Sequence, residues 1–358
     1  MAKFRKIGIL TSGGDAPGMN AAVRAVARKA LDEGVEVVGI IGGYSGLINE
    51  NIIPLTPRSV SNIISRGGTM LYTDRCLEFK TEEGMQKAIA TCRAHEIDAI
   101  VALGGDGTFR GATDLTNRGI PSVGIPCTID NDITATDYTI GFDSAMNTTM
   151  HMIDCLRDTC VSHARCNVVE VMGRDCGQIA LYTALASGAV GAVVPEVPFD
   201  EKELIDRIST LARTGKRGFL VVVSEGVLTP DGQKYGEVLA KRIADGTGVE
   251  TKFARLAHVV RGGSPTLRDR LTATKMGVAA VETLMEGKSN VVICEVDGKI
   301  VETDINYALI ADRTYKNKLK PGDHDAFAPE QVAEMRALAE RRRAEIVEAY
   351  DMLAHTSK

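Results

Sequence analysis

The sequence predicts an α/β protein with mainly parallel sheets, and three observations support this fold class. The chain has 358 residues, more than the roughly 250 to 300 at which a single core stops growing, so we expect two domains. Short apolar runs alternate with helical patterns, as in proteins whose parallel sheet is covered on both faces. Two of these runs lead directly into glycine loops, at strand ends where such folds bind ligands.

The first half of the chain repeats the order of strand, loop and helix. An apolar run at 6–11 leads into the glycine loop Ser12–Asn20, and a helical pattern follows over 21–33. Repetition of this kind implies a parallel sheet. The other elements expected here are a buried strand at 35–41, a short helix at 59–64, a helix at 82–95, and a strand at 99–103 that runs into Gly104–Thr108.

A second set of alternating elements begins after Asp143. The segment 329–353, rich in Ala, Glu and Arg, predicts a polar amphipathic helix that packs or makes an oligomer contact rather than taking part in catalysis. The elements expected before it are a helix ending at 158, a strand at 167–171, a helix at 177–187, strands near 192 and at 219–224, a helix at 269–286, and a strand near 290–294.

Composition and charge argue against several classes of protein. Hydrophobic residues make up 44% of the chain and charged residues 25%, and both fractions are ordinary for a globular protein. The sequence has no apolar run long enough to suggest a membrane span, so we expect no membrane partner. A net charge of -5 argues against a general nucleic-acid surface but allows a local basic pocket for phosphate. Without CxxC spacing or a signal peptide pattern, the eight cysteines predict reduced thiols, no disulfides and a cytoplasmic location.

Two glycine loops are candidates for phosphate binding, because backbone N–H groups at a helix start favour anions. Neither loop contains the dinucleotide pattern GxGxxG or a P-loop, and as isolated turns they could be purely structural. The second loop, Gly104–Thr108, includes Asp106, a carboxylate of the kind that a magnesium nucleotide requires. Asp106 is therefore the candidate metal contact, with a helix cap as the alternative.

The segment Thr128–Asp132, with the sequence TIDND, is the candidate for acid–base chemistry. Asp130 and Asp132 lie at i and i+2, on one side if the segment is extended. Phosphoryl transfer to an alcohol needs a group that accepts the hydroxyl proton, and an aspartate near metal and phosphates suits that role. The alternative is ordinary turn chemistry.

Arginines near predicted strand ends are candidates for binding a phosphate, because the guanidinium pairs bidentately with phosphate oxygens. Arg165, Arg174 and Arg261 occupy such positions. Any one of them could instead be a solvated surface residue, but three together favour an anionic ligand.

Eight motifs in one order resemble the 6-phosphofructokinase family. They are TSGGDAPGMNA (11–21), RGGT (66–69), GGDGT (104–108), TIDND (128–132), DYTIGFD (137–143), VVEVMGR (168–174), VPE (194–196) and RGGSP (261–265).

The resemblance implies two similar three-layer α/β domains, with the chain crossing between them. Residues 1–141 with about 260–308 would bind nucleotide, and 142–259 with about 309–358 would bind the sugar phosphate and include the C-terminal helical extension. It also implies a homotetramer that phosphorylates fructose 6-phosphate at the 1-hydroxyl, with ATP as donor and Mg²⁺ as cofactor.

The resemblance also assigns roles by position. Asp130 matches the proton acceptor, with Thr128, Asp132 and Arg174 as its catalytic neighbours, and Asp106 matches the metal ligand. Residues on the nucleotide side are Gly14, Tyr44, Arg75, Cys76, Gly105, Asp106, Gly107 and Thr108. Residues on the sugar-phosphate side are Thr128, Asp130, Met172, Gly173, Arg174, Glu225, Lys252, His258 and Arg261, together with Arg165, which would reach the site of a neighbouring subunit.

The identity of the donor depends on two positions of the family pattern. Pyrophosphate users commonly have Asp in place of Gly107 and Lys in place of Cys127, whereas ATP users usually have Gly at both. Gly107 therefore favours ATP. A pyrophosphate-dependent enzyme remains the alternative, followed by a catalytically silent subunit that senses sugar phosphates, and other sugar phosphates remain possible acceptors.

Two further departures concern anion binding. Lys252 replaces an arginine of the sugar-phosphate site, and Arg255 is a candidate to compensate. At the family's effector site, Pro57 replaces an arginine and Val190 a glutamate, so we expect altered or absent effector control. The basic residues that match this effector site are Arg24, Arg28, Arg157, Lys216 and Arg217.

Overall fold

A computed structural model describes residues 4–357, which divide into two compact units. The first unit contains the chain up to Ile129 together with Ile133–Ser144 and Arg261–Ala339. The second contains Asp130–Asp132, Ala145–Val260 and the chain from Glu340 onward. The chain therefore crosses between the units several times. Residues 309–339 fall in the first unit, whereas the sequence analysis placed them with the second domain.

The first unit is built on one mixed sheet, seven-stranded within the described residues, in the order β11-β10-β5-β4-β1-β2-β3. Its inner strands are parallel, and β3 and β11 pair antiparallel at the two edges. Strand β4 is buried along its whole length, as expected for a continuous apolar run covered on both faces. The strands are β1 (Lys6–Thr11), β2 (Glu36–Ile40), β3 (Ile52–Pro54), β4 (Ala99–Gly104), β5 (Ser122–Pro126), β10 (Val291–Val296) and β11 (Lys299–Asp304).

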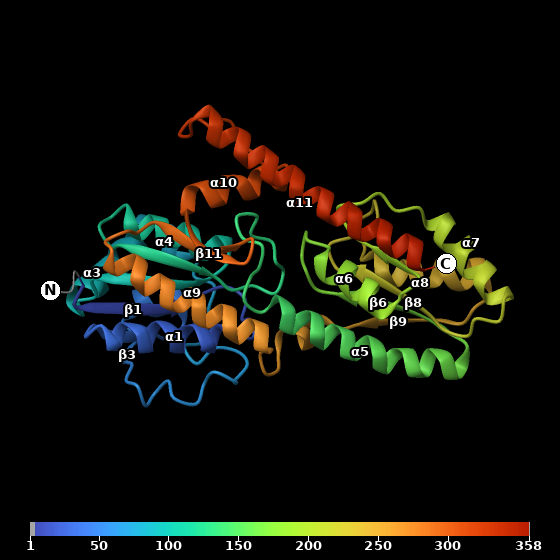
Figure 1. Cartoon of the computed structure of the whole chain (residues 1–358), viewed down its shortest axis with the longest axis horizontal. Helices are drawn as coiled ribbons and strands as arrows, with labels where there is room; N and C mark the ends of the chain where they lie inside the picture. The colour runs from blue at the N-terminus through green and yellow to red at the C-terminus, as the bar shows by residue number, and fades with distance from the viewer. Residues whose placement is uncertain (1–3, 358) are drawn as a thin grey trace. The chain divides into compact units, whose positions relative to one another are not determined.

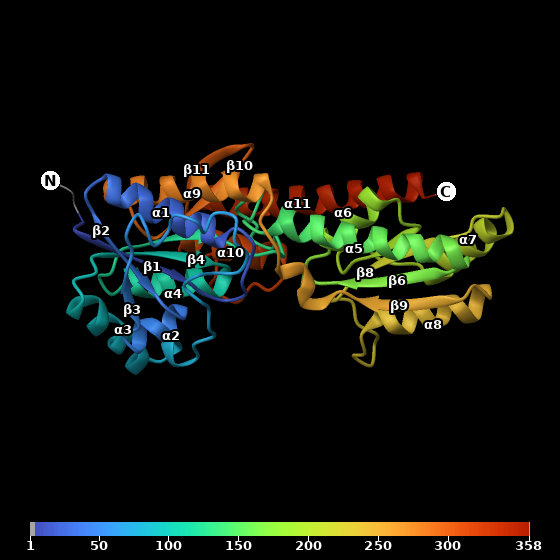
Figure 2. The same cartoon turned by 90° about the horizontal axis from the view of Figure 1, so that it is seen from below.

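Helices cover both faces of this sheet, as Figures 1 and 2 show. Helices α1 and α9 lie side by side on one face, where Gly277 allows close contact: a Cβ there would lie 2.6 Å from the Ala25 Cβ. Side chains of α2, α3, α4 and α10 form the core on the other face. The helices are α1 (Met19–Asp32), α2 (Gly43–Ile48), η1 (Glu78–Lys80), α3 (Glu82–Ala94), α4 (Asp106–Thr116), α9 (Leu267–Met285) and α10 (Ile305–Tyr315).

The second unit has a parallel sheet, four-stranded within the described residues, in the order β7-β8-β6-β9. Helices α7 and α8 contribute Leu204, Ile208 and Leu239 to the core on one face, and α5 and α6 lie on the other face (Figure 2). The elements are α5 (Phe142–His163), β6 (Cys166–Val171), α6 (Gln178–Ser187), β7 (Gly191–Val193), α7 (Glu201–Arg213), β8 (Phe219–Ser224), α8 (Tyr235–Thr247), β9 (Thr251–Arg255) and η2 (Ala257–Arg261).

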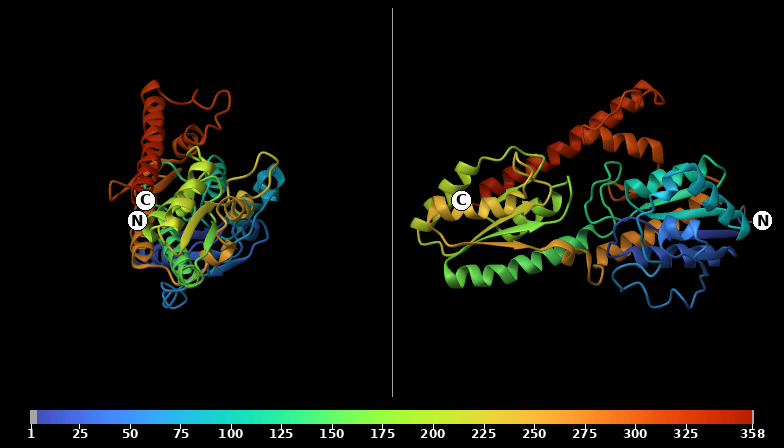
Figure 3. Two further views of the ribbon diagram at one scale, coloured as in Figure 1. Left: turned by 90° about the vertical axis from the view of Figure 1, so that its right-hand side faces the viewer. Right: turned by 180° about the vertical axis from the view of Figure 1, so that it is seen from behind.

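The predicted C-terminal helix is present as α11 (Pro329–Thr356), and Figure 3 shows it as one continuous helix at the red end of the chain. Met335 packs with Ile310 and Ala311 in the first unit, and Ile346 and Leu353 are buried in the second. The predicted helix is therefore present and its buried residues pack within the chain, while an oligomer contact by this helix stays a prediction.

The predicted helix at 59–64 is wrong. Residues 57–62 form turns, in which the Thr56 amide donates to the Ser59 hydroxyl over 2.8 Å and the Ser59 amide donates to the Thr56 hydroxyl over 3.2 Å. Such side-chain to backbone bonds compete with the helical ladder. The sequence analysis also missed the hairpin of β10 and β11, although the Asp297-Gly298 pair at its turn, with φ of 49° and 73°, is a typical hairpin signal.

Two chemical expectations concern the whole chain. The eight cysteines are all within the described residues, and all are free thiols. Across residues 4–357, none of the helices combines the length and the apolar character that a bilayer span requires.

Candidate active site

The first sheet gathers the predicted phosphate loops at one edge. Strands β1, β4 and β5 are parallel neighbours, so the loops that follow them leave from the same edge. The Ser12 amide donates to the Leu103 carbonyl over 3.0 Å, and the Thr108 hydroxyl donates to the Ser12 carbonyl over 3.1 Å. The Cys127 amide joins the third loop by donating to the Gly104 carbonyl over 2.9 Å. The structure therefore brings together both glycine loops and the start of the TIDND segment.

Glycines in the loop after β4 meet two different requirements. A Cβ at Gly104 would lie 2.4 Å from the Ser12 carbonyl oxygen, so a side chain there would keep the two loops apart. A Cβ at Gly105 or Gly107 would meet no described atom within 4 Å. Packing explains the first glycine, whereas the other two border open space that a ligand could enter.

Tyr44 supports this loop from its buried side. Its ring is 4% exposed, and its hydroxyl donates to the Thr108 carbonyl over 2.6 Å. The ring stacks on Phe79 with 4.1 Å between centroids, and burial raises the pKa of the Tyr44 hydroxyl. Tyr44 therefore helps to place the loop as a neutral hydrogen-bond donor, while its contact with a nucleotide stays a prediction.

Asp106 is the first residue of α4. The N-cap of this helix is Gly105, so the alternative in which Asp106 caps the helix is wrong. The Oδ1 atom of Asp106 is buried without a hydrogen-bond partner among residues 4–357, and Arg110 Nη2 lies 3.7 Å from Oδ2. Mg²⁺ takes one or two carboxylates and completes its shell with water and phosphate oxygens, so a carboxylate between two glycines that border open space is suited to hold it.

A second carboxylate that the sequence analysis missed lies next to Asp106. Asp312 in α10 is 2% exposed, and its Oδ1 accepts a hydrogen bond from the Thr134 amide over 2.5 Å. Lys316 Nζ lies 3.7 Å from its Oδ2. Burial raises the pKa of the Asp312 carboxyl well above its ordinary range, and the neighbouring Asp106 adds to the rise. No motif marks Asp312, because the contact joins distant parts of the chain.

Arg261 packs against the first glycine loop. It is 8% exposed, and its Nη1 donates to the Asp15 carbonyl over 3.0 Å. A Cβ at Gly14 would lie 2.7 Å from the same Nη1 atom. The structure therefore joins Arg261, predicted for the sugar phosphate, to Gly14, predicted for the nucleotide.

The second sheet presents charged residues at the corresponding edge. Strands β6 and β8 are parallel neighbours, so Met172–Arg174 and Glu225 follow them at the same edge. The Glu225 carboxylate accepts hydrogen bonds from the Gly173 amide over 3.3 Å and from the Arg174 amide over 3.2 Å. Gly173 has a φ of 142° and Arg174 a φ of 53°, so this turn needs such support. The three residues form one cluster, as predicted from their positions.

Asp130 lies in the same unit as this cluster. Its carboxylate is 1% exposed and lies 3.3 Å from the Arg174 guanidinium Nε. The surrounding TIDND segment is not extended: Ile129 and Asp130 form a turn, and Asn131 has a φ of 49°. Asparagine tolerates this left-handed conformation better than most residues, so turn geometry overrides the expected alternation of Asp130 and Asp132.

Arg165 and Lys252 share one carboxylate. The Arg165 Nε donates to Glu250 Oε2 over 2.7 Å, and Lys252 Nζ lies 3.0 Å from Glu250 Oε1. These two cations lower the pKa of Glu250 to about 2. The structure therefore places the two predicted phosphate-binding cations side by side.

Arg255 does not stand beside Lys252. Residues three apart in a strand point to opposite faces, and the Arg255 guanidinium bonds Glu170 over 2.6 Å. The hypothesis that Arg255 compensates at the position of Lys252 is therefore not supported by the geometry.

The other predicted residues differ in burial. Arg75 and His258 are exposed, Cys76 is half-buried, and Thr128 and Cys127 are buried.

Three of the arginines matched to an effector site donate hydrogen bonds to nearby backbone carbonyls. Arg28 donates to the Pro57 carbonyl over 2.9 Å in the first unit. In the second unit, Arg157 donates to the Ser187 carbonyl, Arg217 donates to the Val161 carbonyl over 3.3 Å, and Val190 is 2% exposed. The effector prediction itself stays untested.

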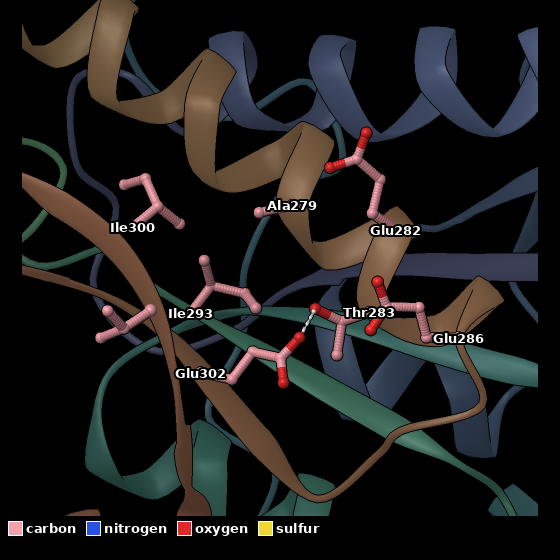
Figure 4. Close-up of a pocket in the computed structure, with 8 residues that line it drawn as sticks. Ala279, Glu282, Thr283, Glu286, Ile293, Ile300 and Glu302 are labelled. Carbon is pink, nitrogen blue, oxygen red and sulfur yellow. Dashed lines mark hydrogen bonds between the residues drawn. The ribbon is translucent and has the colours of Figure 1, made fainter.

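A pocket elsewhere in the first unit has a different chemistry. It lies between α9 and the β10–β11 hairpin, and Figure 4 shows Glu282, Glu286 and Glu302 around it, with Thr283 donating to Glu302 over 2.9 Å. Lys288 Nζ lies 2.8 Å from both Glu286 and Glu302. Because its ionisable lining groups are carboxylates, this pocket is unsuited to a phosphate.

Comparisons with known proteins agree with these motifs. The family model described as Phosphofructokinase matches residues 6–284. The chain belongs to the phosphofructokinase family. Among its relatives, the ATP-dependent 6-phosphofructokinase 1 of Clostridium perfringens is 50% identical over 316 residues, covering 88% of this chain and 97% of that protein. The ATP-dependent 6-phosphofructokinase of Clostridium acetobutylicum is 49% identical with the same coverage.

Solved phosphofructokinase structures have the same fold. The chain matches phosphofructokinase from Saccharomyces cerevisiae with a TM-score of 0.85 and 30% identity, covering 99% of this chain and 50% of that one. It matches the T-state enzyme of Pichia pastoris with a TM-score of 0.84 and 32% identity, covering all of this chain and 40% of that one. The chain thus spans half or less of these yeast chains. The predicted α/β fold class and the predicted family are both confirmed.

Proposed function

We propose that this phosphofructokinase transfers the terminal phosphoryl group of ATP to the 1-hydroxyl of fructose 6-phosphate, which yields fructose 1,6-bisphosphate and ADP. The observation that carries the proposal is the buried Asp130 carboxylate, 3.3 Å from Arg174 in the unit that also holds Gly173 and Glu225. The 50% identity to a protein named ATP-dependent 6-phosphofructokinase supports the choice of substrates.

Asp130 is the proposed proton acceptor. As the oxygen of the 1-hydroxyl forms its bond to the terminal phosphorus, the bond from phosphorus to the bridging oxygen of ATP breaks, and the hydroxyl proton passes to the Asp130 carboxylate. ADP leaves with the bridging oxygen, and the proton is later released to water. Arg174 supplies a positive charge beside Asp130 and a fork suited to phosphate oxygens.

The first unit is the proposed nucleotide-binding part and the second the proposed sugar-phosphate part. In the first, Gly105 and Gly107 border open space, and Thr108 holds two loops together. Asp106 would hold Mg²⁺, which neutralises charge on the phosphate oxygens when bound. A small residue at 107 leaves room for a nucleotide, which supports ATP over pyrophosphate.

The experiment that tests this function is a matrix of donors and acceptors on one preparation. ATP and pyrophosphate are each combined with fructose 6-phosphate, tagatose 6-phosphate and sedoheptulose 7-phosphate, and release of ADP or phosphate is followed together with the sugar product. We expect the highest kcat/KM for ATP with fructose 6-phosphate. Turnover with pyrophosphate alone would reject ATP as donor, and no turnover with any pair would favour a silent sensing subunit.

We further propose a cytoplasmic homotetramer in which Arg165 serves the site of a neighbouring subunit. The family resemblance and the partial exposure of Arg165, 28% of its side chain, support this arrangement. Light scattering measures the number of subunits in the assembly.

A mixing experiment tests the shared site. Arg165→Ala and Asp130→Ala chains, each inactive alone, are dissociated, mixed and reassembled. Activity should return, because some sites in the hybrids then contain both native residues, and hybrids without activity would contradict a shared site.

A further inference from the structure

We propose that Gln178 is a positioning residue for the catalytic loop Asp130–Asp132. Its Oε1 atom accepts a hydrogen bond from Asn131 Nδ2 over 2.7 Å. Asn131 lies between the two carboxylates assigned to catalysis, and all of these residues belong to the second unit. The inference rests on the proposed function, because it concerns the proton acceptor of that reaction.

Gln178 is itself held firmly. It is the first residue of α6 and 8% exposed. The amide of the preceding Gly177 donates to Glu196 Oε1 over 2.8 Å, and a Cβ at Gly177 would lie 2.4 Å from the Val194 Cβ. The start of α6 is therefore tied to the segment after β7, and a buried side chain on a fixed helix end can hold a neighbouring loop.

The catalytic loop needs such a support. Asn131 has a φ of 49°, in the left-handed region, which persists only where the surroundings determine it. The bond from Gln178 reaches the loop at this residue, one position after Asp130. Proton transfer needs heavy atoms about 2.6–3.2 Å apart, and a misplacement of about 1 Å can lower a rate by about a hundredfold. Losing the bond should therefore slow chemistry rather than weaken nucleotide binding.

A double-mutant cycle tests this role. Gln178→Met removes the acceptor oxygen while keeping the length of the side chain, and Asn131→Gly removes the donor at a position whose φ suits glycine. Each variant should lower kcat by about tenfold or more and leave the KM for ATP within about twofold. The double variant should lose no more than the more damaged single variant, because both remove the same bond.

Three controls separate positioning from loss of structure. Gln86→Met changes another helical glutamine, whose amide bonds the exposed Glu82 over 2.7 Å, and should leave kcat unchanged. Gln178→Glu keeps an acceptor oxygen and should keep kcat within about threefold of the wild type, about the limit expected for a retained hydrogen bond. Thermal midpoints and ATP binding establish that each variant is folded.

The outcomes are distinct. An unchanged kcat in folded Gln178→Met, or losses that multiply in the double variant, would overturn the inference while leaving the proposed function intact. If Gln178→Met does not fold, Gln178→Glu decides, since a tenfold loss there contradicts the role of the acceptor oxygen. A wild type that transfers no phosphoryl group from ATP to fructose 6-phosphate would reject the proposed function and this inference with it.

Discussion

The carboxyl edges of the two sheets differ in the groups that they present. The edge of the first sheet consists mainly of glycines and backbone groups, with Gly105 and Gly107 beside open space. The corresponding edge of the second sheet presents charged groups, namely the Asp130–Arg174 pair and Glu225, whereas Arg165 and Lys252, paired with Glu250, lie at the opposite, amino-terminal edge of that sheet. If both edges bind ligands as proposed, we expect the first to select by space and backbone donors and the second by charge. Added side chains should therefore perturb the first edge, and removed or altered charges the second.

The largest effect should come from the charged edge. Asp130→Ala removes the proton acceptor, so kcat should fall by about 10²–10⁴-fold, while ATP binding measured by calorimetry stays close to that of the wild type. Asp154→Ala, which changes an exposed aspartate on α5, is the matched control. A kcat for Asp130→Ala within a few-fold of the wild type would remove Asp130 from the mechanism.

On the glycine edge, Gly107→Asp should lower kcat/KM for ATP by about tenfold or more, because a carboxylate in the open space would repel the phosphates. The fold should tolerate the change, since a Cβ at Gly107 meets no described atom within 4 Å. Gly107→Ala adds volume without charge, so it should lower kcat/KM for ATP by less than Gly107→Asp does. Equal kcat/KM values for the Ala and Asp variants would show that charge is irrelevant at this position.

A smaller gain is expected from Lys252→Arg, at the amino-terminal edge of the second sheet. A guanidinium binds phosphate oxygens bidentately where an ammonium acts as a point charge, so the KM for fructose 6-phosphate should fall by about threefold. Steady-state kinetics measures this change, and Lys241→Arg, at an exposed position of α8, is the control. A raised KM would indicate that Lys252 does not contact the substrate.

The smallest effect concerns stability and pH. Arg165 and Lys252 lower the pKa of Glu250 to about 2, against an ordinary 4.5, so their contribution to stability is fully present above about pH 4.5 and is lost as the pH falls towards 2. Glu250→Gln removes this contribution. Its thermal midpoint should lie at most about two degrees below that of the wild type at pH 6, and the gap should close in acid. A gap that widens in acid would contradict the ion pairs.

The sequence predictions succeeded where neighbouring residues along the chain mark an element, and they failed where side-chain bonds or an unusual backbone conformation decide the local structure. Strands β1 and β4 are mainly apolar runs, and the glycine loops that follow them have local signatures, so pattern alone located them. The helix expected at 59–64 failed because the hydroxyls of Thr56 and Ser59 bond the backbone locally. The TIDND segment could be extended or a turn on sequence alone, and the structure shows a turn, with Asn131 in the left-handed conformation.

The sequence by itself determined the α/β class and the family, because hydrophobic periodicity and motif order are properties of neighbouring residues. Only the tertiary structure decided which side chains meet: Asp312 beside Asp106, Glu250 between Arg165 and Lys252, and Gln178 against Asn131. These contacts depend on strand order and on how helices pack across a sheet. Neither leaves a periodic signal along the chain, so the groups that surround the proposed catalytic residues emerged only from the fold.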